Sequence, residues 1–137
     1  CAAAQKFLAD GVGVTSQEYQ ALSTPIYAGG TAPEANVYML WQMKVTDEAK
    51  YAAAYKKMME AQEEGGLASG SYGVNRIMAG GVDGMTHFAY IFGSSMAEMT
   101  EALSVSQASD NFKRFAREVE SIREIITVDA GYTLIQY

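Results

Sequence analysis

The strongest constraint on the fold is a strand-like run that leads directly into an amphipathic helix. Residues 36–45, NVYMLWQMKV, are apolar or aromatic on both alternating sets, which is typical of a strand with two buried faces. At Thr46, a predicted N-cap, the pattern changes to a helical period, and the glycine pair at 65–66 is expected to end the helix. A helix of this kind buries one stripe against a neighbouring layer. The stripe consists of Tyr51, Ala54, Tyr55, Met58 and Met59.

A hairpin, a second helical region and a last strand follow. The GGVDG segment suits a hairpin turn between two β-rich runs, because glycine readily adopts positive φ angles. Ser95 and Glu98 form a capping box that starts a helix, and this helix weakens before Asp110 and restarts after it. A bulge or turn is predicted at 129–131 in the last strand. These elements are expected at residues 71–81, 85–94, 95–122 and 123–137.

The order β-α-β-β-α-β predicts an α+β domain of ferredoxin-like type over residues 36–137, with a four-stranded antiparallel sheet and two helices on one face. Residues 1–35 are richer in glycine, proline and small side chains, and they predict an N-terminal arm with a short helix. The two helices leave one sheet face uncovered. Since soluble proteins rarely expose a large apolar face, a second copy is expected to cover it in a sheet-to-sheet homodimer or a higher oligomer.

This order of elements resembles that of the dimeric α/β-barrel superfamily, which includes antibiotic-biosynthesis-monooxygenase-like and stress-responsive barrel proteins. The resemblance lies in the strand at 36–45 and its helix, the hairpin pair, and the FKRFAREVESI helix before the last strand. It covers about three quarters of the chain and rests on element order rather than on a diagnostic motif. The resemblance implies a homodimer with a ligand cavity in each protomer. Some members are cofactor-free oxygenases of polycyclic phenols, and others degrade haem.

The charge of the chain excludes some classes of partner. The net charge is −6, and the ten Lys and Arg residues are scattered, whereas nucleic-acid binding needs clustered basic side chains. The densest basic group, at 113–117, fits the solvated side of a helix. No apolar run approaches the ~20 residues that a transmembrane helix requires. We therefore expect neither a nucleic-acid partner nor a transmembrane segment.

Cys1 is the only cysteine, so an internal disulfide is excluded. It has two interpretations: the lipid-bearing first residue of a processed bacterial lipoprotein, or the boundary of a fragment. The first, together with the lack of other cysteines, is compatible with an exported, periplasmic or lipid-anchored protein. With a single histidine and no second cysteine, a metal site would need carboxylates that fall mostly on solvated helix faces, so neither a metal nor a cofactor is expected.

His87 is the candidate catalytic residue. If it faces a cavity together with Ala89 and Ile91, its imidazole can act as a general base near neutral pH. The alternative is a structural histidine that is hydrogen-bonded within its strand. If binding or assembly is the only role of the protein, His87→Ala is expected to leave its stability nearly intact.

The candidate ligand-binding residues are polar or aromatic side chains within the strands. Neighbours along a strand point to opposite faces, so only one of Asn75 and Arg76 faces the interior or the dimer interface, and a buried Arg needs an anionic partner. The nine tyrosines and eight methionines suit either a pocket for an apolar or aromatic molecule or an ordinary core. The predicted set is Tyr38, Gln42, Asn75, Arg76 and Tyr90.

Three functions follow from these patterns. The first is a dimeric protein that binds a small apolar or aromatic molecule. The second is a cofactor-independent monooxygenase or isomerase, with His87 as the base. The third is a structural assembly subunit whose N-terminal arm docks on a neighbour. A cavity lined by His87 and other polar groups would favour the enzyme, and an apolar cavity would favour binding alone.

Overall fold

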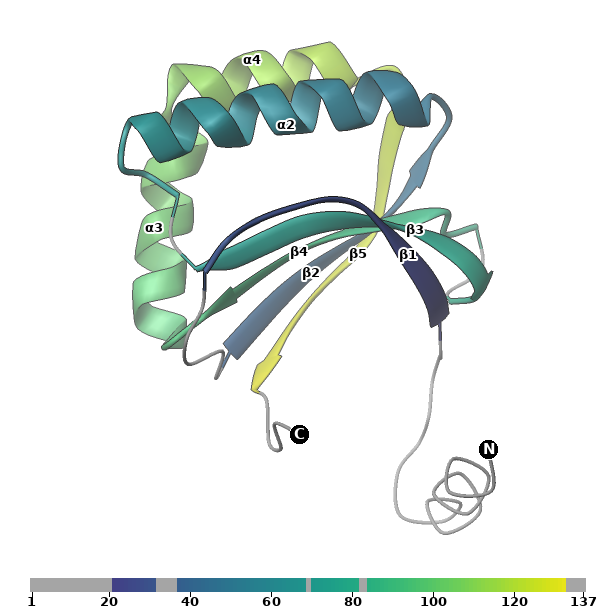
Figure 1. The fold of residues 1–137 in the computed structure, drawn as a ribbon, viewed down its shortest axis with the longest axis horizontal. Helices are drawn as coiled ribbons and strands as arrows, with labels where there is room; N and C mark the ends of the chain where they lie inside the picture. The colour runs from purple at the N-terminus through teal and green to yellow at the C-terminus, as the bar shows by residue number, and fades with distance from the viewer. Residues whose placement is uncertain (1–20, 32–36, 69, 82–83, 133–137) are drawn as a thin grey trace, which may run out of the picture.

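The computed structural model describes residues 21–31, 37–68, 70–81 and 84–132, which form one antiparallel sheet and three helices (Figure 1). The protein is therefore of the α+β class. The short helix expected in the N-terminal arm lies outside the described residues. The elements are β1 Ala21–Gly30, β2 Val37–Val45, α2 Glu48–Glu64, β3 Ser71–Gly80, β4 His87–Gly93, α3 Met96–Ala108, α4 Asp110–Val119 and β5 Arg123–Tyr132.

The sheet has five strands in the order β1-β3-β4-β2-β5, and every neighbouring pair is antiparallel. The prediction of four strands was wrong because residues 21–30 pair with β3 along their whole length. Pro25 and the glycine pair at 29–30 predicted an irregular segment without a strand. An edge strand tolerates such residues, because on one of its sides it makes no hydrogen bonds to another strand. The pairing of β1 with β3 contains two register shifts.

Two helices cover one face of the sheet, and the third stands at its end. In Figure 1, α2 and α4 lie side by side above the strands, and α3 runs roughly at right angles to them. The predicted weak point between the two last helices is a true break at Ser109, which caps the end of α3 and the start of α4. No helix among the described residues covers the lower face of the sheet.

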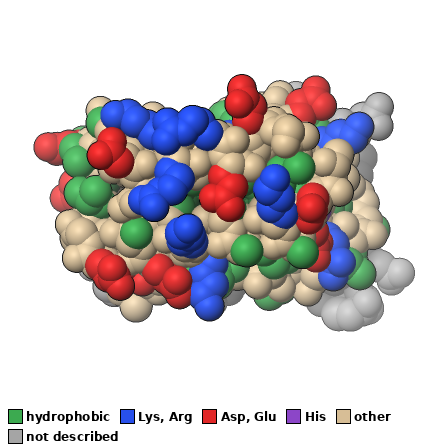
Figure 2. Space-filling view, turned by 90° about the horizontal axis from the view of Figure 1, so that it is seen from above, with side chains coloured by type: hydrophobic (Ala, Val, Ile, Leu, Met, Phe, Trp, Pro, Cys, Tyr) green, Lys and Arg blue, Asp and Glu red, His purple; other side chains and the backbone are tan. Residues whose placement is uncertain are grey.

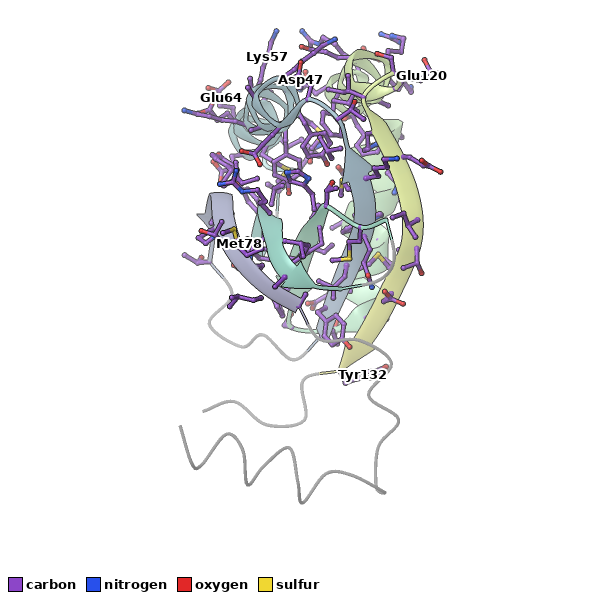
Figure 3. All side chains as sticks on the ribbon, turned by 90° about the vertical axis from the view of Figure 1, so that its right-hand side faces the viewer. Asp47, Lys57, Glu64, Met78, Glu120 and Tyr132 are labelled. Carbon is purple, nitrogen blue, oxygen red and sulfur yellow. The ribbon has the colours of Figure 1, made fainter. Side chains whose placement is uncertain are left out.

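The core lies between the sheet and the pair α2–α4, where side chains fill the space (Figure 3). The predicted stripe of α2 is confirmed, since all five of its residues are buried, and Gln62 continues it. On α4, Phe115 and Val119 are buried against the same layer. The upper, solvent-facing side of the two helices carries interspersed acidic and basic side chains (Figure 2). Lys113, Arg114 and Arg117 are exposed, as predicted.

Two local predictions were shifted along the chain. The N-cap of α2 is Asp47 rather than Thr46, and its carboxylate accepts a hydrogen bond from the backbone N–H of Lys50 at 3.0 Å. The irregularity in β5 falls near Ile126 rather than at 129–131, where the ladder with β2 is continuous. Two other predicted helix ends are confirmed: Gly65 is the C-cap of α2, and Ser95 is the N-cap of α3.

Candidate functional site

The predicted site residues divide between the two faces of the sheet. The strand registers align Gln42 with Phe88 and Phe88 with Asn75, so these three side chains share one face. This is the lower face, away from α2 and α4. Arg76 follows Asn75 and His87 precedes Phe88, so these two side chains point to the opposite, upper face, beside the core. The members of the lower face are Tyr38, Leu40, Gln42, Asn75, Phe88, Tyr90 and Phe92.

Four aromatic rings form a connected surface on the lower face. Tyr90 lies between Phe88 and Phe92 along β4, with ring centroids 6.3 and 5.4 Å apart. Tyr38 on β2 contacts Phe92 with a centroid separation of 6.3 Å. All four side chains are only half-buried. The sequence reasoning missed Phe88 and Phe92, although the alternation along β4 places them on the same side as Tyr90.

Two glycines allow the tyrosine rings to lie flat on the sheet. A Cβ atom on Gly73 would stand 2.6 Å from the hydroxyl oxygen of Tyr90 and 2.6 Å from the carbonyl oxygen of Tyr27. A Cβ atom on Gly131 would stand 2.6 Å from the hydroxyl oxygen of Tyr38. Each ring thus covers the glycine of the neighbouring strand, which is a known way to compensate a glycine in a sheet. Burial raises the pKa of the Tyr90 hydroxyl above its usual value.

Polar groups stand at both sides of this aromatic surface. The side-chain amide of Gln42 donates to the carboxylate of Asp129 on β5. The amide of Asn75 donates to the hydroxyl of Ser23 on β1 at 3.1 Å, and its Oδ1 has no partner among the described residues. The lower face can therefore offer flat apolar contacts together with a hydrogen-bond acceptor.

His87 is 4% exposed, and both of its ring nitrogens are engaged. Nε2 lies 3.0 Å from the carboxylate of Glu48, and Nδ1 lies 2.8 Å from the hydroxyl of Thr86. The backbone N–H of Val45 donates to the same hydroxyl oxygen at 2.8 Å. Every group is satisfied if Nε2 carries the proton and Thr86 donates to Nδ1. In this tautomer the lone pair of Nδ1 accepts a hydrogen bond, whereas a general base needs a free lone pair.

Arg76 shares Glu48 with His87. Its guanidinium nitrogen lies 3.4 Å from the second carboxylate oxygen, and the Arg76 side chain is 49% exposed. The partner of this arginine is thus a protein carboxylate at the start of α2, at the rim of the upper face. The cluster joins the first turn of α2 to the β3–β4 hairpin, and it lies on the opposite face from Tyr38, Gln42, Asn75 and Tyr90.

The described ranges contain no group of three or more His, Cys, Asp or Glu residues placed to hold a metal ion. None of their helices combines the length and hydropathy needed to cross a bilayer.

Comparisons with known proteins give a likeness of fold. No protein-family model and no curated protein matches the chain. Among solved structures, a putative monooxygenase from Lactobacillus acidophilus is 17% identical with a TM-score of 0.54, covering 79% of this chain. A major regulator of staphylococcal pathogenesis is 17% identical with a TM-score of 0.49, covering 82% of this chain and 66% of its own. The chain spans about half (48%) of the length of the monooxygenase that it matches. The first of these likenesses shows a shared α+β fold.

Proposed function

We propose that the protein is a homodimer that binds a small apolar or aromatic molecule at the lower face of its sheet. The observation that carries this proposal is the connected surface of Tyr38, Phe88, Tyr90 and Phe92, with two rings laid flat over glycines. Flat aromatic surfaces bind planar apolar molecules by stacking and by excluding water. The half-buried Asn75 supplies a hydrogen-bond acceptor that fixes the orientation of a ligand, while the buried Gln42 holds the carboxylate of Asp129 on β5.

A second copy is the partner that this face fits best. Near the centre of the lower face, Leu40 lies between Tyr90 on β4 and Asp129 on β5, and the carboxylate of Asp129 is already paired with the amide of Gln42. Charged side chains are depleted at the centre of stable interfaces, whereas aromatic residues are enriched there. Two copies related by a two-fold axis would present the same aromatic surface to each other and enclose the ligand between them.

Leu40→Asp tests the dimer. A carboxylate at the centre of the interface would be desolvated without a cation, so we expect the dissociation constant of the dimer to rise roughly 100-fold. Analytical ultracentrifugation over a concentration series measures this change. Leu40→Asn, a neutral isostere of the Asp variant, separates loss of the interface from repulsion by Asp129. Val105→Asp is the control, because Val105 is an exposed apolar residue on α3, with 51% of its surface accessible.

A monomeric wild-type protein, or an unchanged dimer in both Leu40 variants, contradicts the proposed interface. Native mass spectrometry of the purified protein then reports the subunit number and any retained molecule together. Retention of an apolar ligand by the wild type, and its loss from Tyr90→Ala, is the expected result.

The second candidate function is a cofactor-independent monooxygenase or isomerase. The fold likeness to the putative monooxygenase favours it. In this case the substrate would bind on the upper face beside Glu48 and Arg76 rather than on the lower face, and His87 would act as the base only after the hydroxyl of Thr86 releases Nδ1. Oxygen uptake with a panel of polycyclic phenols, abolished by His87→Gln while ligand binding persists, would support this candidate over binding alone.

A further inference from the structure

A small cavity lies where α2, α3 and the strands β3 and β4 meet, apart from the lower face. Its volume is about 60 Å³. Most of its wall is apolar, formed by residues such as Met59, Leu67, Ile91 and Met99. Two polar side chains, Gln62 and Ser106, also line it.

Gln62 is buried but not fully hydrogen-bonded. It is 3% exposed, and Ser106 is 8% exposed. The hydroxyl of Ser106 donates to Oε1 of Gln62 at 2.8 Å, while Nε2 has no partner among the described residues. Exchanging the two ends of the amide would pair Nε2 with Ser106 and leave Oε1 alone. In either orientation one buried polar atom lacks a partner, and such a group favours an occupant that hydrogen-bonds to it.

The size of the cavity limits that occupant. An apolar cavity of about 150 Å³ holds benzene, and a water molecule takes about 30 Å³ of liquid volume. A cavity of about 60 Å³ thus accepts only a few non-hydrogen atoms. Haem and polycyclic phenols are excluded from it. The walls also disfavour ions, because none of the described residues that line the cavity is Lys, Arg, Asp or Glu. The hydroxyl of Tyr72, another wall residue, already donates to Glu63.

We propose that this cavity is a binding site for a short-chain neutral alcohol or carbonyl compound, anchored by the Gln62 amide. A carbonyl oxygen accepts from Nε2, and a hydroxyl group serves either orientation of the amide. The alkyl part then contacts the thioethers of Met59 and Met99, which adapt to varied shapes.

The test uses the full chain with methyl-labelled methionine and NMR titration with propan-2-ol and with xenon. We expect saturable shifts confined to the signals of methionines at the cavity, chiefly Met59 and Met99, with propan-2-ol binding in the millimolar range. Met78 is 60% exposed and reports non-specific contact. Gln62→Met removes the amide at similar volume, so it is expected to weaken propan-2-ol binding at least fivefold while xenon binding persists.

Ala102→Leu fills the cavity from α3 and keeps the test valid if the Gln62 variant does not fold. It is expected to abolish both sets of shifts, whereas the same substitution at Ala97, on the exposed side of α3, leaves them unchanged. The proposal is overturned if wild-type protein binds xenon but not propan-2-ol, if the shifts are uniform and unsaturable, or if Gln62→Met binds propan-2-ol as tightly as wild type. Because the dimer test measures subunit number, its failure is distinguishable from a failure here.

Discussion

At the scale of single residues, Glu48 shows how burial decides what an interaction contributes. One carboxylate oxygen contacts the buried ring of His87 at 3.0 Å, and the other contacts the exposed guanidinium of Arg76 at 3.4 Å. Water competes for the second contact and not for the first. An exposed ion pair contributes about 0–1 kcal/mol, whereas a buried group that loses its partner costs about 1–3 kcal/mol.

His87→Ala is therefore expected to lower the free energy of unfolding by about 2 kcal/mol or more, because Thr86 and Glu48 lose their buried partner. This differs from the nearly neutral effect expected from the sequence, where the burial of His87 could not be seen. Arg76→Ala, which removes the exposed partner of the same carboxylate, is the matched control and is expected to cost under about 1 kcal/mol. Urea denaturation measures both. Equal losses in the two variants would contradict this account.

At the scale of elements, the sequence predicted best where one pattern repeats many times. The stripe of α2 runs from residue 51 to residue 59, about two and a half helical turns, and all of its five predicted residues are buried. The fifth strand could not be predicted, because the pairing of β1 with β3 is a long-range interaction and the local signal of Pro25 pointed the other way. Gln62 was not predicted to be buried because a polar side chain is not expected in an apolar stripe. It nevertheless continues the stripe, three residues after Met59.

In the candidate site too, repeated patterns were predicted from the sequence and long-range contacts were not. Alternation along β2 and β4 is enough to place Tyr38, Gln42 and Tyr90 on one face. Strand alternation also predicted that the side chains of Asn75 and Arg76 point to opposite faces of the sheet. It could not identify Glu48 as the partner of the arginine. Glu48 and Arg76 are far apart in the sequence, and no helical or strand periodicity links them. Their contact depends on how α2 crosses the strands.

The junction between α3 and α4 gives a prediction at this scale. The hydroxyl of Ser109 accepts from the backbone N–H of Phe112 at 3.2 Å. Ser109→Ala is expected to lower the free energy of unfolding by about 1 kcal/mol, the usual contribution of an N-cap. Ser104→Ala, at an exposed position within α3, is the control and is expected to be neutral or slightly stabilising, because alanine favours helix. Chemical denaturation distinguishes the two, and equal stability of the variants would argue against the cap.

At the scale of the whole molecule, buried tyrosines set the response to alkaline pH. Burial raises the pKa of Tyr51, Tyr55 and Tyr72 above the usual value, and in Tyr72 the hydrogen bond to Glu63 adds to this effect. The folded state thus keeps these protons more tightly than the unfolded state does. Their contribution is fully present below pH about 10 and is lost as the pH rises further.

We expect the free energy of unfolding to fall above pH about 10, by up to about 1.4 kcal/mol per pH unit for each buried tyrosine. Tyrosinate absorbance is expected to rise together with the loss of structure rather than before it. Tyr55→Phe should make the fall less steep, and Tyr132→Phe, at a side chain that is 67% exposed near the lower end of β5, should not (Figure 3). A flat profile up to pH about 11 would refute this expectation.

The two borders of the sheet differ in their capacity to accept another strand. β1 carries Pro25, which has no N–H to donate, and its ladder is twice out of register. β5 contains no proline, and Ile125, Ile126, Val128 and Tyr132 are exposed along it. Strand addition is therefore favoured at β5 and disfavoured at β1. Growth of a fibril needs both borders, since each added copy would present its own β1 outward, so the proline-bearing border limits polymerisation without any change to the lower face.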